Sequence, residues 1–556
     1  MKSIKKYILS LGVVAAAMSL GSCTGDLDLQ PIDPSTVNSS QFADDPEGYM
    51  NRVLAEIYQS FVTFGPNGDS QIKAADGGMT TFQRAIFNLE EIPTDEASWF
   101  SSSDAGLFTL QYGNISSDND MILATYSRLL VNIALCNSFI QVYNNGDFHL
   151  TGDLVAKGED AVRQCKILRS ACYFYLIDLF GNVPYADETV AIGTNAPQLS
   201  RAEIFNLVTK TLEDVIAEYG SANKAAAYGY VGKDVAQGVL VKYYLNAEVF
   251  TGTPRWNDCL RVANDLISAH KGTGFRNSGL AENWFDIVSA KNKDFAIGGS
   301  NACSEILWIL PADADHIESY SGAALLMLAG IKTDEEKARI GVGNGWGCLK
   351  GRPQLVNRFQ WNEPTQATSP DKRVAFWSTS KDGYTNEMKN MTLSGWTESG
   401  YTQTKLINRY LNADGTVNMN DDGLAPASGD GRLTTACPML RLSEIYLSAA
   451  EAILHGAGAK ADALEYVNLI RERAGVRAWQ ANELTLETLQ DERCRELYQE
   501  NCRRTDLIRY GKWTSGYNWA WKGNAANGTD FPAYYNLYPI PAQIVSMSTY
   551  KQNPGY

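Results

Sequence analysis

The sequence predicts a mostly α-helical protein in which paired helices carry a long irregular insertion with a few short strands. Two observations predict this class. Apolar residues recur at three- and four-residue spacing through the first half and again near the C-terminus, which is the period of amphipathic helices. Residues 272–438 break this pattern, because short apolar runs alternate there with Gly, Asn, Ser and Thr. The 556-residue chain is 44% hydrophobic, which excludes disorder for most of its length.

The first residues have the pattern of an export signal. Three lysines within residues 2–6 precede an apolar run over residues 7–20, and small residues lead up to Cys23. A Cys after small residues resembles the lipobox of bacterial lipoproteins, in which that Cys is lipidated, for example with palmitate, and becomes the first mature residue. We expect a lipoprotein signal peptide over 1–22, lipid attachment at Cys23 and a tether over 23–43. The alternative is an ordinary signal peptide with an incidental Cys.

An N-terminal helical region is expected over residues 44–271. Residues 156–180 carry one apolar stripe that ends at Gly181, a residue that closes helices at low cost. Ser200 and Glu203 have the capping-box spacing at the start of the next helix. A loop-rich segment that includes residues 94–100 separates the first two helices. The helices expected in this region cover residues 44–61, 120–143, 156–180, 201–219, 234–250 and 256–270.

The insertion over residues 272–438 is too long to be an inert linker. It holds half of the twelve tryptophans, and the apolar run over residues 305–310 predicts a short strand in which Trp308 lies in the core. The C-terminal region over 439–556 returns to helical spacing and ends in an aromatic, loop-like tail. Helix hairpins of about 34 residues resemble tetratricopeptide units. The helices expected in the C-terminal region cover residues 440–454, 460–473 and 486–498.

The composition favours contact surfaces over proton-transfer chemistry. The chain has 28 Tyr, 19 Phe and 12 Trp but only four His. Its 63 acidic residues against 48 basic ones give a net charge of -15, which argues against nucleic acid and against peripheral binding to anionic lipid. The four His lie far apart in the sequence, so no His-rich metal site is expected. There is no phosphate-binding loop, no HExxH and no GxSxG in the sequence.

No cofactor is expected. A weak structural Ca²⁺ site is the alternative, because residues 418–423 begin like a calcium-binding loop, although Gly429 stands where such a loop needs a bidentate Glu. Apart from Cys23 the chain has nine cysteines, an odd number without a CxxC motif. We expect them to be buried thiols that pack as small apolar side chains.

Five ordered motifs in the last third of the chain resemble the SusD/RagB family of surface glycan-binding lipoproteins. The motifs are residues 441–447 with 450–452, 467–475, 492–509, 538–541 and 552–556. Asn501 departs from the family pattern, which usually has Gly there, but Asn also tolerates the left-handed backbone conformation. Residues 94–97 and 179–184 are similar to family segments as well. The motifs place opposite charges three or four residues apart on helix faces, so we expect them to stabilise the fold.

The resemblance implies a SusD-like fold in which tetratricopeptide-like helix pairs support irregular loops. Members of the family do no catalysis. They face the exterior at the cell outer membrane, capture oligosaccharide and pass it to a SusC-type TonB-dependent transporter. Their glycan site is a shallow arc of aromatic rings, drawn from the loop after the Thr-Asp-Glu segment and from the middle insertion. Carried over by position, the resemblance nominates Trp99, Phe100, Tyr320 and Trp346 as glycan-binding residues.

Aromatic residues suit this role because the apolar C–H faces of sugars stack on their rings. Trp99 in a polar loop and Trp346 in a Gly-Asn-Gly-Trp-Gly segment are expected to be exposed. Two other functions stay open. A glycoside hydrolase needs only two carboxylates about 5–10 Å apart, which sequence alone cannot place. An import lipoprotein that captures peptides is the other alternative. The motifs do not identify the sugar.

Overall fold

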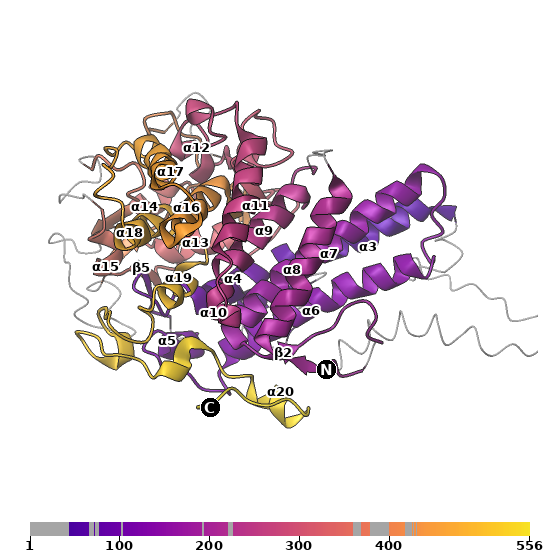
Figure 1. Ribbon diagram of the computed structural model, residues 1–556. Helices are drawn as coiled ribbons and strands as arrows, with labels where there is room; N and C mark the ends of the chain where they lie inside the picture. The colour runs from indigo at the N-terminus through magenta and orange to yellow at the C-terminus, as the bar shows by residue number, and fades with distance from the viewer. Residues whose placement is uncertain are drawn as a thin grey trace, which may run out of the picture.

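The computed structural model describes residues 44–65, 72, 77–101, 104–191, 194–220, 226–359, 369–378, 400–417, 425, 427–429 and 431–556 (Figure 1). The expected signal peptide, tether and lipid attachment at Cys23 lie outside the described residues. So does the segment 418–423, which was considered for Ca²⁺. Among the described residues, no group of three or more His, Cys, Asp and Glu side chains is arranged to hold a metal ion.

Consecutive helices pack in chain order and form one stack. α6 packs on α7, α7 on α8, α8 on α9 and α9 on α11 (Figure 1). The stack then passes from α11 directly to α16 and α17, although residues 271–441 lie between α11 and α16 in the sequence. The long insertion is therefore looped out between two neighbouring helices. The helices of the stack are α3 (Pro46–Val62), α6 (Asp120–Asn144), α7 (Asp153–Phe180), α8 (Arg201–Tyr219), α9 (Lys233–Leu245), α11 (Trp256–His270), α16 (Leu442–Ala452) and α17 (Lys460–Arg473).

The helices expected from apolar spacing are confirmed, and α8, α11 and α17 begin and end at the expected residues. The capping box of Ser200 and Glu203 is present at the start of α8. Two expected helices differ in detail. The helix expected over 234–250 is interrupted at Asn246, after which α10 (Ala247–Thr251) begins. The helix expected over 440–454 is α16, and after Ala452 it passes into a π-helical turn, η9 (Ile453–Ala457). Gly456 in this turn has a φ of 98°.

α6 is long and apolar enough to cross a membrane by length and composition. In this fold 61% of its apolar 18-residue stretch is buried, because α6 packs against α4 (Phe82–Glu90) and α7. α6 therefore serves as a core helix of the stack.

The structure has helices in several segments that were expected to be loops, which corrects that part of the prediction. Every residue of α4 is buried, including the polar Gln83 and Asn88, and so is every residue of α13 (Gly322–Gly330). α13 has no polar residue, so its sequence lacks the alternation that predicts a helix, whereas α4 does have apolar residues at helical spacing (82, 85, 86 and 89) and buries its polar side chains as well. The other helices of these segments are η3 (Gly77–Thr80), α5 (Ala105–Leu110), η4 (Phe275–Asn277), α12 (Trp284–Val288), η5 (Asn292–Phe295), α14 (Asp334–Ile340) and α15 (Pro353–Val356).

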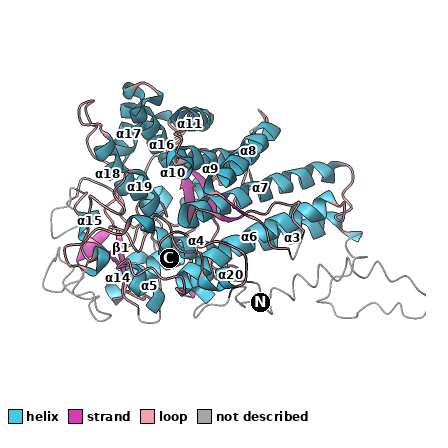
Figure 2. Ribbon diagram, turned by 60° about the horizontal axis from the view of Figure 1, so that its bottom comes forward, coloured by secondary structure: helices cyan, strands magenta, loops and turns pink. Residues whose placement is uncertain are grey.

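Short antiparallel strands tie the N-terminal half to the insertion. β1 (Ala97–Trp99), which is labelled in Figure 2, pairs with β5 (Leu349–Gly351). The register places Trp99 opposite Leu349. β5 also pairs with β7 (Tyr401–Gln403), and β7 pairs with β6 (Phe376–Ser378). The strand expected over 305–310 is confirmed as β4 (Ile306–Leu310), which pairs with β10 (Cys437–Arg441), and Trp308 lies in the core.

The remaining elements lie outside the stack. They are β2 (Val183–Pro184), β3 (Gln198–Leu199), β8 (Ala427–Gly429), β9 (Arg432–Leu433), α18 (Leu486–Leu497), α19 (Arg503–Arg509), η10 (Lys522–Asn524), η11 (Ala533–Asn536) and α20 (Ala542–Ser546). All nine cysteines other than Cys23 lie in the described part of the chain, where each is a buried free thiol, as expected.

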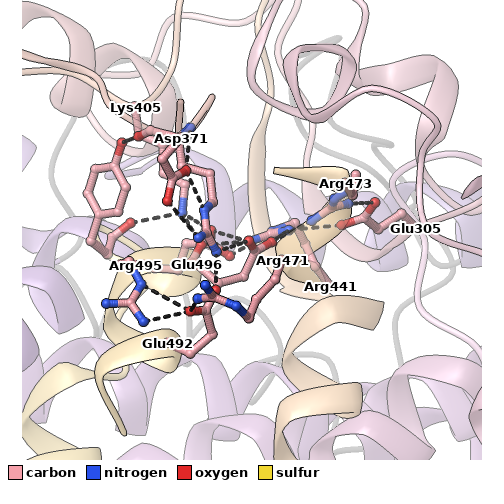
Figure 3. Close-up of polar contacts among 12 residues, drawn as sticks. Glu305, Asp371, Lys405, Arg441, Arg471, Arg473, Glu492, Arg495 and Glu496 are labelled. Atoms are coloured by element: carbon pink, nitrogen blue, oxygen red, sulfur yellow. Dashed lines mark hydrogen bonds and ion pairs between the residues drawn. The ribbon is translucent and has the colours of Figure 1, made fainter. Parts of the chain in front are cut away.

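A buried ion-pair network around α18 joins the insertion to the C-terminal helices (Figure 3). The carboxylate of Glu496 lies 3.1 Å from Arg373 of the insertion, 3.0 Å from Arg441 of β10 and 2.6 Å from Arg473 of α17. All four side chains are at most 1% exposed. Burial alone would raise the pKa of Glu496, but the three guanidinium groups outweigh it and hold that pKa well below its usual range.

Glu492, one helical turn earlier, belongs to the same network. Its carboxylate lies 2.8 Å from Arg373, 2.6 Å from Arg471 and 2.6 Å from Arg495. Only the pair with Arg495 runs along the helix, as the sequence spacing predicts. The motif charges are therefore paired within the fold, but most of these pairs cross between elements in the core.

The Thr-Asp-Glu segment before β1 is held by the C-terminal region in the same way. Both oxygens of Asp95 accept hydrogen bonds from Arg503 of α19, at 2.7 and 2.8 Å. Arg358 of the insertion lies 2.9 Å from the same carboxylate. These contacts fix the start of β1, and with it the residues that follow.

Glu90 docks the end of α4 onto the first turn of α19. Its Oε2 accepts hydrogen bonds from the backbone N–H and the hydroxyl of Thr505, at 3.1 and 2.9 Å. Burial raises the pKa of Glu90 to about 8, and the nearby charge of Asp178 contributes to the rise. Glu90 is thus a carboxyl group that the fold holds more readily when it is protonated.

Replacing Glu496 by Gln should lower the free energy of unfolding by about 3–5 kcal/mol, because it leaves buried arginines without their shared carboxylate. Urea unfolding followed by circular dichroism measures this. The matched control is Asp214→Asn, which removes the charge from the exposed pair of Lys210 and Asp214. The control should cost less than about 1 kcal/mol. Equal losses in the two variants would contradict the importance of burial.

The stability of the protein should fall with rising pH because of Glu90. The folded pKa of about 8 lies above the ordinary value of 4.5. The stabilising contribution is therefore fully present below about pH 4.5 and is lost as the pH rises through about 8. Glu90→Gln cannot ionise, so its free energy of unfolding should fall less between about pH 5 and pH 9 in urea titrations. Parallel pH profiles for the two proteins would contradict this assignment.

Candidate functional site

Two of the aromatic residues predicted for glycan binding meet at the first turn of α4. The guanidinium carbon of Arg84 lies 5.8 Å from the centre of the Trp99 ring and 6.0 Å from that of the Trp346 ring. These are the distances of cation–π contacts. Trp99 comes from β1 and Trp346 from the insertion, so Arg84 brings together two rings from distant parts of the chain.

Trp99 ends β1 and is only 1% exposed. Its indole Nε1 donates a hydrogen bond of 2.9 Å to Oδ2 of Asp104. The side chain of Gln111 accepts a hydrogen bond from the backbone N–H of Trp99 at 2.8 Å and donates one to its carbonyl at 2.7 Å. This corrects the expectation of an exposed ring in a polar loop, because some of the polar residues nearby are hydrogen-bond partners of a buried indole.

Trp346 lies in a loop, as expected, and its ring is partly exposed. Its backbone N–H donates a hydrogen bond of 2.6 Å to the carbonyl of Leu328 in α13. The flanking glycines permit this approach. A Cβ at Gly345 would lie 2.6 Å from the carbonyl oxygen of Ile331, and Gly347 has a φ of 69°. The Gly-Asn-Gly-Trp-Gly segment thus places the Trp346 ring beside the end of α13.

Tyr320 belongs to a segment that docks on the same turn of α4. The backbone N–H of Arg84 donates a hydrogen bond of 3.2 Å to the hydroxyl of Ser321, and the first N–H of α13 donates one of 2.9 Å to Oε1 of Gln83. The Tyr320 side chain is partly exposed, and its hydroxyl donates to Glu318 at 2.9 Å. The segments that carry Trp99, Trp346 and Tyr320 therefore converge on α4.

Phe100 is separate from this group. It is 5% exposed and packs in a small cluster with Phe108, Tyr112 and Trp521, whereas Trp99 belongs to the main core. Consecutive residues of an extended chain point to opposite sides, which explains why two neighbours join different clusters.

Sequence reasoning missed Arg84 and Asp104. Nη2 of Arg84 lies 3.8 Å from Oδ1 of Asp104, and the two side chains are 4% and 6% exposed. The two residues have only their closeness in space in common, because Arg84 lies in α4 and Asp104 lies in the segment after β1. No sequence period reports such proximity, although the apolar spacing of residues 82, 85, 86 and 89 could have placed Arg84 on a helix.

The chemistry available in this group is stacking and hydrogen bonding. The thiol of Cys348 lies two residues after Trp346 in the sequence. Burial raises the pKa of Cys348 to about 12, and the charge of Asp104 adds to the rise, so the thiol stays protonated at neutral pH. One hollow beside the segment of Tyr320, lined by Ser319 and Ser321, has a volume of about 30 Å³. On the same measure one water molecule needs about 10–15 Å³, so this hollow does not enclose a sugar ring.

Known proteins are similar to this chain in sequence and in fold. Residues 315–556 match the model of the SusD family. The sequence is 28% identical to the starch-binding protein SusD of Bacteroides thetaiotaomicron, in an alignment that covers 100% of this chain and 99% of that protein.

Solved structures share the fold over most of the chain. Surface glycan-binding protein A from Bacteroides fluxus superposes with a TM-score of 0.65 at 19% identity, over 92% of this chain and 99% of that one. Surface glycan-binding protein A from Bacteroides thetaiotaomicron in complex with laminarihexaose gives a TM-score of 0.63 at 19% identity, over 91% and 99%. The expected mostly α-helical, SusD-like fold is therefore confirmed.

Proposed function

Because this chain belongs to the SusD family, we propose that it is a non-catalytic protein of the cell surface that binds glycans. The observation that carries the proposal is the convergence of Trp99, Trp346 and the segment of Tyr320 on α4. It occurs in a fold shared with a laminarihexaose-bound protein, and the sequence aligns throughout with a starch-binding one.

The partly exposed rings of Trp346 and Tyr320 supply faces on which the C–H sides of a sugar stack. Trp99 is buried, so it supports the site from beneath through Arg84 and Asp104. A net charge of -15 disfavours strongly anionic glycans, which leaves neutral or weakly polar oligosaccharides as the ligand class. Binding of this kind requires no cofactor.

We also propose that lipid on Cys23 anchors the protein to the outer membrane, facing the cell exterior, and that a SusC-type TonB-dependent transporter receives the oligosaccharide. The export pattern before Cys23 and the family resemblance of the C-terminal motifs support this proposal. An anchored protein needs no basic surface to stay at a membrane, which agrees with its acidic balance.

Trp346→Ala and Tyr320→Ala should each weaken glycan binding by about tenfold, because each removes one stacking face. Hexasaccharides from starch, laminarin, xylan, mannan and pectin serve as probes, with affinities measured by isothermal titration calorimetry. The matched control is Trp256→Ala. Trp256 is also partly exposed, but it lies in α11, where it stacks on His455 at 4.1 Å between ring centres. Unchanged affinity in both site variants would show that the binding surface lies elsewhere.

The same mixtures distinguish binding from catalysis. New reducing ends released by the purified protein would contradict a non-catalytic role and favour a glycan-active enzyme. Failure of the unaltered protein to bind any of the five hexasaccharides would contradict glycan binding.

Cys23→Ser should release the protein from the membrane fraction, because a serine hydroxyl cannot take the place of the lipidated thiol. Immunoblots of separated membrane and soluble fractions measure this. Mild detergent extraction of the unaltered protein, followed by affinity purification and mass spectrometry, should recover a TonB-dependent transporter. Continued membrane association of the Ser variant would contradict the lipid anchor, and recovery of the protein alone would contradict the transporter partnership.

A further inference from the structure

A second group of aromatic side chains lies beside the predicted glycan site. Phe100, Phe108, Tyr112 and Trp521 pack together in a cluster that is separate from the main core, and we call these four residues the aromatic platform. Phe100 is almost fully buried, and the other three are partly exposed. The rings of Phe108 and Tyr112 lie 5.5 Å apart at an angle of 90°. The platform thus presents aromatic surface to solvent from α5 and from the C-terminal region, which lie side by side (Figure 1).

The platform is joined to the site at α4 by short, rigid links. Phe100 directly follows Trp99, and its backbone N–H donates a hydrogen bond of 2.8 Å to the carbonyl of Cys348, two residues after Trp346. Gln111, which precedes Tyr112, clamps both backbone groups of Trp99. The two aromatic surfaces therefore share the backbone of β1 and cannot move independently.

The turn that presents Trp521 adopts a conformation that bulky residues rarely accept. Trp521 has a φ of 68°, and Gly523 and Asn524 also have positive φ, at 64° and 59°. A Trp in the left-handed region costs of the order of 1 kcal/mol or more and persists only where the surroundings enforce it. Such positions gather at binding sites, because the strain fixes a side chain in one place.

Two buried cations hold this turn. Arg352 donates a hydrogen bond of 2.5 Å to the carbonyl of Ala520 and one of 2.6 Å to the carbonyl of Ala97 in β1. Lys522 is fully buried and donates one of 2.8 Å to the carbonyl of Tyr517. The turn of Trp521 is thereby tied to the strand that carries Trp99.

Arg352 shows that this arrangement is costly. Its side chain is 0% exposed, its Nη2 has no hydrogen-bond partner, and no carboxylate in the described part of the chain pairs with it. Burial lowers its pKa to about 10. A buried cation of this kind opposes stability. Its contacts fix the position of the Trp521 turn relative to β1, so Arg352 acts as a positioning residue for the platform.

We propose that the aromatic platform is a second sugar-stacking surface, which holds a neutral pyranose ring further along the same oligosaccharide that occupies the site at α4. This inference rests on the proposed function. Aromatic rings suit the apolar face of a pyranose, and two such surfaces on one rigid strand extend the site along a longer chain. The platform therefore makes affinity depend on the length of the oligosaccharide.

The test compares a trisaccharide with a hexasaccharide of whichever probe series the unaltered protein binds, by isothermal titration calorimetry. Trp521→Asn removes the ring but keeps a residue that tolerates positive φ. Phe108→Ala removes a second ring from a different element, so a folding defect at one position does not decide the result. Each variant should weaken binding of the hexasaccharide by about tenfold and leave binding of the trisaccharide unchanged. Trp256→Ala is again the matched control, and thermal unfolding verifies that each variant is folded.

Two results would overturn the inference while leaving the proposed function intact. One is hexasaccharide affinity that neither platform variant changes, while Trp346→Ala still weakens it. The other is an equal loss for the trisaccharide and the hexasaccharide, which would make the platform the primary site and not an extension of it. Absence of binding to every probe by the unaltered protein would overturn the proposed function together with this inference.

Discussion

The carboxylates of α18 are the constraint on which the remaining structure depends. Glu492 and Glu496 are fully buried, and their arginine partners come from the insertion, from β10 and from α17. A buried charge is costly unless it is paired. Moving any one of these segments away would therefore leave unpaired charges buried in the others. The insertion is therefore bound into the C-terminal helices by Arg373. A second set of buried pairs, between Asp95 and the arginines Arg503 and Arg358, extends the same logic to β1.

The helix stack and the irregular segments contribute differently to the molecule. The helix stack supplies a large apolar core, but no side chain of the candidate site comes from α7, α8, α9 or α11. The site is built where α4, β1 and the insertion meet, and buried carboxyl groups fix two of these elements: α4 through Glu90 and β1 through Asp95. Rigid support of this kind lowers the entropic cost of binding, since the rings need no ordering when a ligand arrives. The described segments that form the site are thus held in place by buried polar contacts.

The sequence predicted the stack well and the site only in part. Amphipathic spacing placed α8, α11 and α17 at their observed ends, because a helix with one solvent face records that face in its sequence. α13 escaped prediction for the opposite reason, as it is apolar on every side. α4 has helical apolar spacing, but its nine residues are a short signal within a segment expected to be a loop. Trp99 was expected at the surface, yet its partner Asp104 and the clamp of Gln111 hold it inside. Arg84 was not foreseen, since only the folded chain reveals that it lies between two tryptophans.

The direct packing of α11 on α16 has a consequence for how such proteins diversify. Residues 271–441 leave the stack and return to it at two adjacent points. The entropy of closing a loop grows only with the logarithm of its length, so doubling the length of such an excursion costs only about 0.6 kcal/mol. Segments of the insertion that lie apart from Arg373 and Arg441 can therefore lengthen, shorten or change sequence while the helices remain in place. The residues that would select a ligand can therefore change in the insertion while the helix stack keeps its structure.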